Sequence, residues 1–281
     1  MKKIIWISSY PKSGNTWIRY FLFNYFFNKK KVDSSFGILN NIDKFPPHQY
    51  LENIIDKNIV GKNPFNISKY WLKIQSEIVK SDNDVIFFKN HNALLSIEGN
   101  DFTNEVFSLG AIYIVRDPRD VVVSYSNFLH NLNISQTINR VTTKKLICHT
   151  SKKNSLDIEI LGSWKLNYIS WRDGVEKMPK IIIRYEDLIY NTYKTKLKIL
   201  NFLSTLLHFK VDIDQLNFSI YQSEFNRLKK IENIHGFHKN EKKFFNSGKT
   251  KQWDQILNKE QIDIIENDFK DEMIELGYLN Q

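Results

Sequence analysis

The sequence predicts an α/β fold in which a central parallel sheet is flanked by helices, and two observations carry this prediction. Four short apolar runs are typical of buried strands, at residues 3–10, 84–89, 110–116 and 180–185. Stretches with helical spacing separate these runs, and non-alternating strands that alternate with helices are typical of a parallel sheet covered on both faces. No repeat or linker divides the 281 residues, so we expect one domain over residues 1–281 with a helical C-terminal portion.

The elements are predicted in order along the chain. Apolar residues recur at three- and four-residue steps from Trp17 to Tyr25, which predicts a helix over 15–27, after the first strand and a tight loop. Residues 28–66 are rich in Asn, Pro and Gly and predict irregular structure with short helices, as do residues 209–258. Longer helices are predicted at 68–79, 117–132, 155–178, 191–207 and 259–276.

The composition is that of a globular protein. Hydrophobic residues make up 42% and charged residues 25%, which excludes a disordered chain, and the low Gly, Pro and Cys counts exclude collagen-like and disulfide-stapled classes. Cys148 stands alone, so no intrachain disulfide is available and we expect a cytoplasmic protein. The apolar start ends at Ser8 with no small-residue cleavage site, and no apolar run approaches the roughly 18 residues of a membrane helix.

The net charge of +9 favours anionic partners. Nucleic acid, a membrane surface and a polyphosphorylated small molecule would all satisfy it. The basic residues are scattered along the chain, so charge alone does not select among these partners.

The first strand–helix junction predicts an anion site. It reads Tyr-Pro-Lys-Ser-Gly-Asn-Thr-Trp over residues 10–17. A loop between a buried parallel strand and a helix directs backbone N–H groups and the helix dipole at one point. Gly14 permits close backbone approach, but Lys12 precedes Gly14, whereas a Walker A motif places its Lys after its last Gly.

At this string the chain resembles the cytosolic-type sulfotransferase family, whose phosphosulfate loop differs from residues 10–17 only at Asn15. The family's 3′-phosphate signature is matched by residues 113–128, and its Lys-Thr-His segment is similar to residues 87–92. Weaker matches occur at residues 162–171 and 184–188. The resemblance runs in matching order from residue 4 to about residue 257.

The resemblance implies a P-loop NTPase-like fold and 3′-phosphoadenosine 5′-phosphosulfate (PAPS) as co-substrate, with 3′,5′-bisphosphoadenosine (PAP) as product and no metal. His91, near neutrality, suits a general base, and the Lys12 and Lys89 ammoniums suit the charge on the transferring sulfuryl group. An Arg and a hydroxyl suit a terminal phosphate. The residues expected to bind the co-substrate are Lys12, Ser13, Gly14, Asn15, Thr16, Trp17, Arg116, Ser124, Tyr185, Ser223, Phe225 and Gly248. We expect Arg119 to pair with a neighbouring Asp at the helix start, in the pattern Arg116–Asp117 and Arg119–Asp120.

One motif departs from the family's pattern. Where the family has Arg-Lys before a Gly, this chain has Asn246 and Ser247 before Gly248, so two cations expected at the 3′-phosphate are missing. The candidates to replace them are Lys249, Lys251 and the pair Lys242-Lys243. The departure predicts weaker co-substrate binding or a shifted loop.

Two other functions remain open. A P-loop kinase would need Lys-Ser/Thr after Gly14, where Asn15-Thr16 stands, and a non-catalytic nucleotide or polyanion binder is compatible with the charge. We expect a small-molecule or saccharide acceptor, no nucleic acid and no membrane span, and we leave a homodimer open. Residues 28–66 and 130–155 are expected to border the acceptor pocket.

Overall fold

The computed structural model of the chain describes residues 3–32, 39, 41–80, 85–128, 132–146, 148–150, 156–235 and 248–280. The chain divides into two units, which we treat separately. Unit 1 comprises residues 1–11, 43–115 and 139–182, and unit 2 comprises residues 12–42, 116–138 and 183–281.

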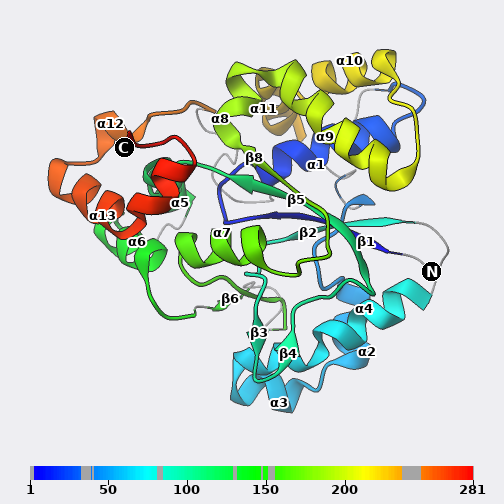
Figure 1. The fold of residues 1–281 in the computed structure, drawn as a ribbon, viewed down its shortest axis with the longest axis horizontal. Helices are drawn as coiled ribbons and strands as arrows, with labels where there is room; N and C mark the ends of the chain where they lie inside the picture. Colours follow the sequence, from blue (N-terminus) through cyan, green and yellow to red (C-terminus); the bar gives the residue numbers. More distant parts are fainter. Residues whose placement is uncertain are drawn as a thin grey trace. The chain divides into compact units, whose positions relative to one another are not determined.

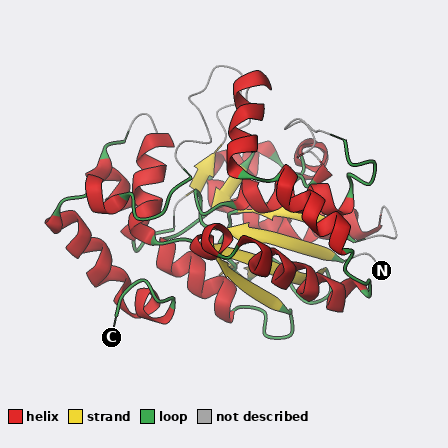
Figure 2. Ribbon diagram, turned by 90° about the horizontal axis from the view of Figure 1, so that it is seen from above, coloured by secondary structure: helices red, strands yellow, loops and turns green. Residues whose placement is uncertain are grey.

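A four-stranded sheet with the strand order β2-β1-β5-β8 organises the fold (Figure 1). Its strands are β1 (Ile4–Ser9), β2 (Ile86–Asn90), β5 (Ser108–Val115) and β8 (Lys180–Arg184). Figure 2 shows them side by side. The central strand β1 pairs in parallel with β2, from Ile4 opposite Ile86 to Ser8 opposite Asn90, and in parallel with β5. All six residues of β1 are buried, which explains its unbroken apolar sequence.

Aromatic side chains form the core of unit 1. The Trp6 ring on β1 lies 5.1 Å from the Phe45 ring and 5.0 Å from the Phe102 ring, and its indole N–H donates to Ser108 Oγ at 2.6 Å. The Trp171 ring stacks 6.3 Å from the Tyr113 ring and so packs its helix on β5. The helices of this unit are α2 (His48–Ile54), α3 (Lys57–Lys62), the 3-10 helix η2 (Pro64–Tyr70), α4 (Trp71–Lys80) and α7 (Trp164–Asp173).

Unit 2 is helical. Its elements include α1 (Asn15–Phe26), α5 (Pro118–Phe128), α8 (Tyr185–Tyr190), α9 (Thr192–Leu207), α10 (Ile213–Gln222), α11 (Phe225–His235), α12 (Trp253–Ile256) and α13 (Lys259–Glu275). Helix α6 (Ile134–Thr142) crosses the division between the units. The Gln215 side-chain amide on α10 donates to the Asn24 carbonyl of α1 at 2.6 Å, which fixes these two helices together. Within the described residues, no helix is both long and apolar enough to cross a membrane.

The predicted α/β class, the parallel sheet and the helical C-terminal portion are confirmed, but the helix predicted over 155–178 is wrong in its first part. Strand β7 (Ile158–Ile160) pairs antiparallel with β6 (Cys148–Thr150), and α7 begins only at Trp164. Gly162 adopts a left-handed φ of +68°, which ends the strand, and Ser163 then caps α7 by accepting from the Leu166 N–H.

Smaller differences concern element boundaries. The helix predicted over 68–79 is a 3-10 helix up to Tyr70 and an α-helix from Trp71. The strands predicted at 84–89 and 110–116 lie at Ile86–Asn90 and Ser108–Val115. The two-residue strands β3 (Ser96–Ile97) and β4 (Asn100–Asp101) form a hairpin that the apolar pattern did not predict.

Candidate functional site

The loop before α1 carries the predicted anion site in unit 2. Gly14 has φ of +101°, and a Cβ there would lie 2.7 Å from the Tyr185 ring, so only glycine fits. Ser13 is fully buried, and its Oγ has no hydrogen-bond partner among the described residues. A buried hydroxyl that lacks a partner, at the start of a helix, fits an anionic oxygen.

Two cations meet at this loop. Burial first, and the Arg116 guanidinium second, lower the pKa of Lys12 to about 8, against the opposing effect of Glu232. The Lys12 ammonium lies 4.3 Å from the centre of the Phe128 ring. Because like charges destabilise each other here, an anion bound at this loop would relieve their repulsion.

Arg116 follows β5, as predicted, and is held by main-chain oxygens. Its guanidinium donates to the carbonyl of Lys12 at 3.1 Å and to the carbonyl of Lys249 at 3.1 Å. It lies 4.3 Å above the Tyr185 ring and is 5% exposed. Ser124, which was predicted to share the phosphate with Arg116, is half-buried on α5.

Aromatic side chains predicted to bind adenine gather beside the loop. The Trp17 ring lies 5.8 Å from the Tyr185 ring and 6.4 Å from the Phe225 ring, both edge-on. A Cβ on Gly248 would lie within 2.6 Å of the Phe225 ring, so this glycine is also packed against the cluster. The structure thus brings together residues that the family resemblance assigned to one binding site.

Ser223 belongs to the same cluster, but its polar groups are used within the protein. Its carbonyl accepts the Trp17 indole N–H at 2.5 Å, and its Oγ accepts from Lys196 Nζ at 2.7 Å. Lys196 is fully buried and was not predicted, because a lysine in the amphipathic sequence of α9 is ordinarily exposed. Burial lowers the pKa of Lys196 to about 7, and Glu224 opposes this shift weakly.

Asp120 on α5 fixes the chain that follows Gly248. Its carboxylate accepts the backbone N–H groups of Lys251, Gln252 and Trp253 at 2.8, 2.9 and 3.2 Å. Its ion pair is with Arg116, at 3.7 Å.

Arg119 pairs with a neighbouring Asp at the start of α5, as expected, but the partner is Asp117 and not Asp120. Arg119 pairs with Asp117 at 2.6 Å and with Glu266 of α13 at 2.5 Å. Since Asp120 already receives three N–H groups, Arg119 is left to tie α5 to α13.

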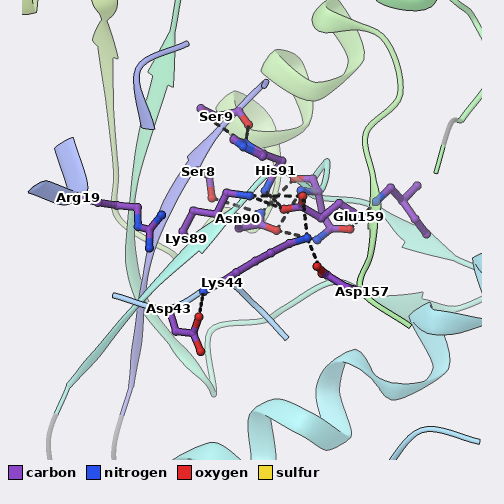
Figure 3. Close-up of polar contacts among 12 residues, drawn as sticks. Ser8, Ser9, Arg19, Asp43, Lys44, Lys89, Asn90, His91, Asp157 and Glu159 are labelled. Carbon is purple, nitrogen blue, oxygen red and sulfur yellow. Dashed lines mark hydrogen bonds and ion pairs between the residues drawn. The ribbon is translucent and has the colours of Figure 1, made fainter. Parts of the chain in front are cut away.

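His91 lies in unit 1, directly after β2, as the sequence predicted (Figure 3). Its Nδ1 lies 2.7 Å from the Ser9 carbonyl oxygen and 3.2 Å from Ser9 Oγ. A carbonyl oxygen only accepts, so Nδ1 carries the ring proton and Nε2 keeps a lone pair. Burial first, then the Lys89 ammonium, lower the pKa of His91 to about 3, so the imidazole is neutral at physiological pH.

A buried carboxylate that the sequence did not predict connects the groups around His91. Glu159 Oε1 accepts from Lys89 Nζ at 3.0 Å and from the His91 backbone N–H at 2.9 Å. Lys44 Nζ lies 3.2 Å from Glu159 Oε2 and also pairs with Asp157 (Figure 3). Glu159 was missed because the strand that carries it was predicted to be helical.

Part of the predicted site lies outside the described residues. This applies to Asn246 and Ser247 and to the pair Lys242-Lys243. Of the proposed substitutes, Lys249 is exposed and Lys251 is held through its backbone by Asp120. In the part of the chain that is described, no cluster of three His, Cys, Asp or Glu side chains could hold a metal ion.

Comparison with known proteins places these features in context. A family model described as "Sulfotransferase domain" matches residues 2–277. The chain is 28% identical over 131 residues to a 3-alpha-hydroxysteroid sulfotransferase of Cavia porcellus, across 47% of this chain and 42% of that protein. It is 27% identical over 139 residues to a 3-beta-hydroxysteroid sulfotransferase of the same animal, across 49% and 45%. The alignments thus span less than half the length of these relatives.

Solved structures share the fold. A mouse sulfotransferase complexed with PAP superposes with a TM-score of 0.58 at 15% identity, over 96% of this chain and 84% of that chain. Retinol dehydratase in a complex with retinol and PAP superposes with a TM-score of 0.60 at 17% identity, over 96% and 81%.

Proposed function

The chain belongs to the sulfotransferase-domain family, and we propose on that premise that it transfers a sulfuryl group from PAPS to a hydroxyl or amine acceptor. In this reaction the acceptor oxygen or nitrogen bonds to sulfur while the bond between sulfur and the bridging phosphate oxygen breaks. PAP leaves with the electron pair, and the acceptor proton goes to a base.

The groups of unit 2 are assigned to the donor. Ser13 Oγ, buried without a hydrogen-bond partner in the described chain, and the backbone at Gly14, Asn15 and Thr16 suit the 5′-phosphosulfate. Lys12 would stabilise the charge that develops on the leaving phosphate oxygen. Arg116 and Ser124 would bind the 3′-phosphate, and the cluster of Trp17, Tyr185 and Phe225 would contact adenine.

His91 is assigned as the base, and one observation carries this proposal. The hydrogen bond from Nδ1 to the Ser9 carbonyl, at 2.7 Å, leaves Nε2 as the acceptor nitrogen of a neutral ring. A pKa near 3 makes the imidazole a weak base, but it also keeps the ring unprotonated and ready over the whole physiological pH range.

Lys89 is assigned to the sulfuryl group. Its ammonium pairs with Glu159 at 3.0 Å. An ammonium has three N–H donors, so this ion pair is compatible with a contact to a sulfuryl oxygen. Lys89 on β2 and His91, which directly follows this strand, both donate to Glu159 Oε1, the first through its ammonium and the second through its backbone N–H.

The acceptor, the location and the assembly are further parts of the proposal. We assign a small-molecule or saccharide acceptor, because androsterone and retinol occupy structures with this fold. Residues 1–281 would act as one sulfotransferase domain in the cytoplasm. A homodimer is compatible with the proposal and is not needed for it.

Turnover with labelled donor tests the function. The chain is incubated with ³⁵S-labelled PAPS and a panel of phenols, steroid alcohols and sugars, and both the labelled product and PAP are quantified. We expect a sulfated product and an equal amount of PAP, without added metal. A thermal shift with Mg-ATP but not with PAP would favour a kinase, and PAP binding without turnover on any acceptor would favour a binding protein.

A further inference from the structure

The side chain of Glu159 is a buried charge in unit 1 that contacts several donors. It is 2% exposed and receives three donors from two parts of the chain: Lys89 Nζ and the His91 backbone N–H from one, and Lys44 Nζ from the other (Figure 3). One oxygen, Oε1, accepts from both Lys89 and His91. Lys89 through its ammonium and His91 through its backbone are therefore tied to a single buried atom.

The charges around this carboxylate explain why it stays ionised. Burial alone would raise the pKa of Glu159, but the Lys44 and Lys89 ammoniums hold it well below its ordinary value. Lys44 is shared with Asp157, and these two side chains are 24% and 22% exposed. The cluster thus contains two ammoniums and two carboxylates around a neutral imidazole.

The groups that face His91 come from several elements. Ser9 on β1 accepts from its ring, the Asn167 side chain on α7 donates to its carbonyl at 3.0 Å, and Lys89 and Lys44 contribute positive charge. Glu159 contributes the negative charge that opposes these cations. Without it, the Lys89 and Lys44 ammoniums would act on the imidazole without the carboxylate that opposes them, and Asp157, the other partner of Lys44, is more exposed than Glu159.

From this geometry we propose that Glu159 is a positioning residue for sulfuryl transfer, which holds the His91 base and the Lys89 ammonium in register with each other. This inference rests on the proposed function. Glu159 itself is not assigned as a base, because its oxygens are occupied by three donors and it is almost unexposed.

The first test is the variant Glu159→Gln, which keeps the shape and removes the charge. We expect kcat to fall about 10- to 10²-fold, as for a catalytic group displaced by a fraction of an ångström to an ångström, with little change in the KM for PAPS. The loss should be greater for weakly acidic alcohols than for nitrophenols, because only the former need a well-placed base. Asp157→Asn, which removes the other carboxylate on Lys44, is the matched control and should show no such dependence on acceptor acidity.

A double-mutant cycle separates positioning from an independent role. If Glu159 acts through His91, the change Glu159→Gln should lower kcat by a smaller factor in the His91→Ala background than in the parent, because only the positioning of Lys89 is then left to lose. Losses that multiply would overturn the proposal. A loss in Glu159→Gln with near-normal turnover in His91→Ala would overturn it as well and would identify Glu159 as the base.

A second readout does not require turnover. The ¹⁵N NMR spectrum of the imidazole, assigned by its loss in His91→Ala, should report one Nδ1–H tautomer in the parent and a mixture in Glu159→Gln. An unchanged tautomer in Glu159→Gln would contradict the positioning role of Glu159. Absence of sulfuryl transfer by the parent would contradict the proposed function, and the two failures can therefore be told apart. If Glu159→Gln fails to fold, the pair Lys44→Met and Glu159→Gln, which also removes a facing cation, is measured in its place.

Discussion

The charged groups are arranged differently in two regions: the His91 cluster of unit 1, formed by His91, Lys44, Lys89, Asp157 and Glu159, and the anion loop of unit 2, which precedes α1. In the cluster, two lysines meet two carboxylates, and Glu159 is held ionised by its neighbours. At the loop, Lys12 and Arg116 repel each other, and a buried serine hydroxyl has no partner among the described residues. In the first arrangement each ammonium pairs with a carboxylate, whereas in the second two cations lie close enough to repel each other.

This difference separates chemistry from binding. A self-balanced cluster keeps its geometry with or without a ligand, which suits a base that must be ready. A site in which two cations repel each other is stabilised when an anion binds there. Substitutions in the two regions should therefore produce different kinetic signatures.

The largest effect is expected for His91→Ala. General-base assistance contributes ~10²- to 10⁴-fold, so kcat should fall by that factor. The affinity for PAP, measured by calorimetry, should stay at the parent value. The exposed His208, changed to Asn because its φ is +54°, serves as the control. If His91→Ala instead lowered the affinity for PAP and left the rate per bound donor unchanged, His91 would be a nucleotide-binding residue and not the base.

Lys12→Ala should lower kcat at least ~10²-fold, because it removes a cation that stabilises the leaving phosphate. The exposed Lys210→Ala is the control. In the parent, kcat/KM for PAPS should also decline above about pH 8, since Lys12 loses its proton there. Lys12→Arg should move this decline to higher pH, and a decline that stays at pH 8 would assign it to another group.

Arg116→Ala should weaken binding rather than chemistry. A lost charge-assisted hydrogen bond is worth roughly 1.5–3 kcal/mol, which is about 10- to 100-fold in the Kd for PAP. Adenosine 5′-phosphosulfate lacks the 3′-phosphate, so its binding should change much less. If the affinity for both nucleotides fell by the same factor, Arg116 would not bind the 3′-phosphate. Arg172→Ala, which removes the surface ion pair between Arg172 and Asp173, provides the control.

The smallest effect concerns stability. Lys196 binds its proton up to about pH 7 in the folded chain and up to 10.5 in the unfolded chain, so the unfolded state holds more protons between these values. The folded state should therefore gain stability as the pH rises from 7 to 10.5. Lys196→Met should raise the Tm at pH 7 by a few degrees and lose this gain, whereas the exposed Lys198→Met should do neither.

Local patterns predicted the loop and the four strands of the central sheet, because those depend on a few neighbouring residues. The unbroken apolar run of β1 and the glycine after it are examples. The clustering of Trp17, Tyr185 and Phe225 was predicted only through the resemblance, because these residues are far apart in the chain.

Glu159 and Lys196 could not be predicted for a physical reason. Ile158-Glu159-Ile160 is compatible with a helix face as well as a strand, and the choice depends on pairing with β6. The role of the carboxylate depends on its ion pairs with Lys44 and Lys89, which come from distant segments. A lysine such as Lys196 is buried only because the helix around it is covered by other elements, which its own sequence does not record.

Asp120 grips the chain after Gly248 entirely through main-chain N–H groups, at Lys251, Gln252 and Trp253. Hydrogen bonds of this kind do not depend on which side chains the bonded residues carry. Most substitutions at residue 252 should keep its hydrogen bond, except proline, which has no N–H. At residue 251, where φ is +56°, β-branched residues are disfavoured as well as proline. The amino acids of this segment can therefore change during evolution while its hydrogen bonds to Asp120 are kept.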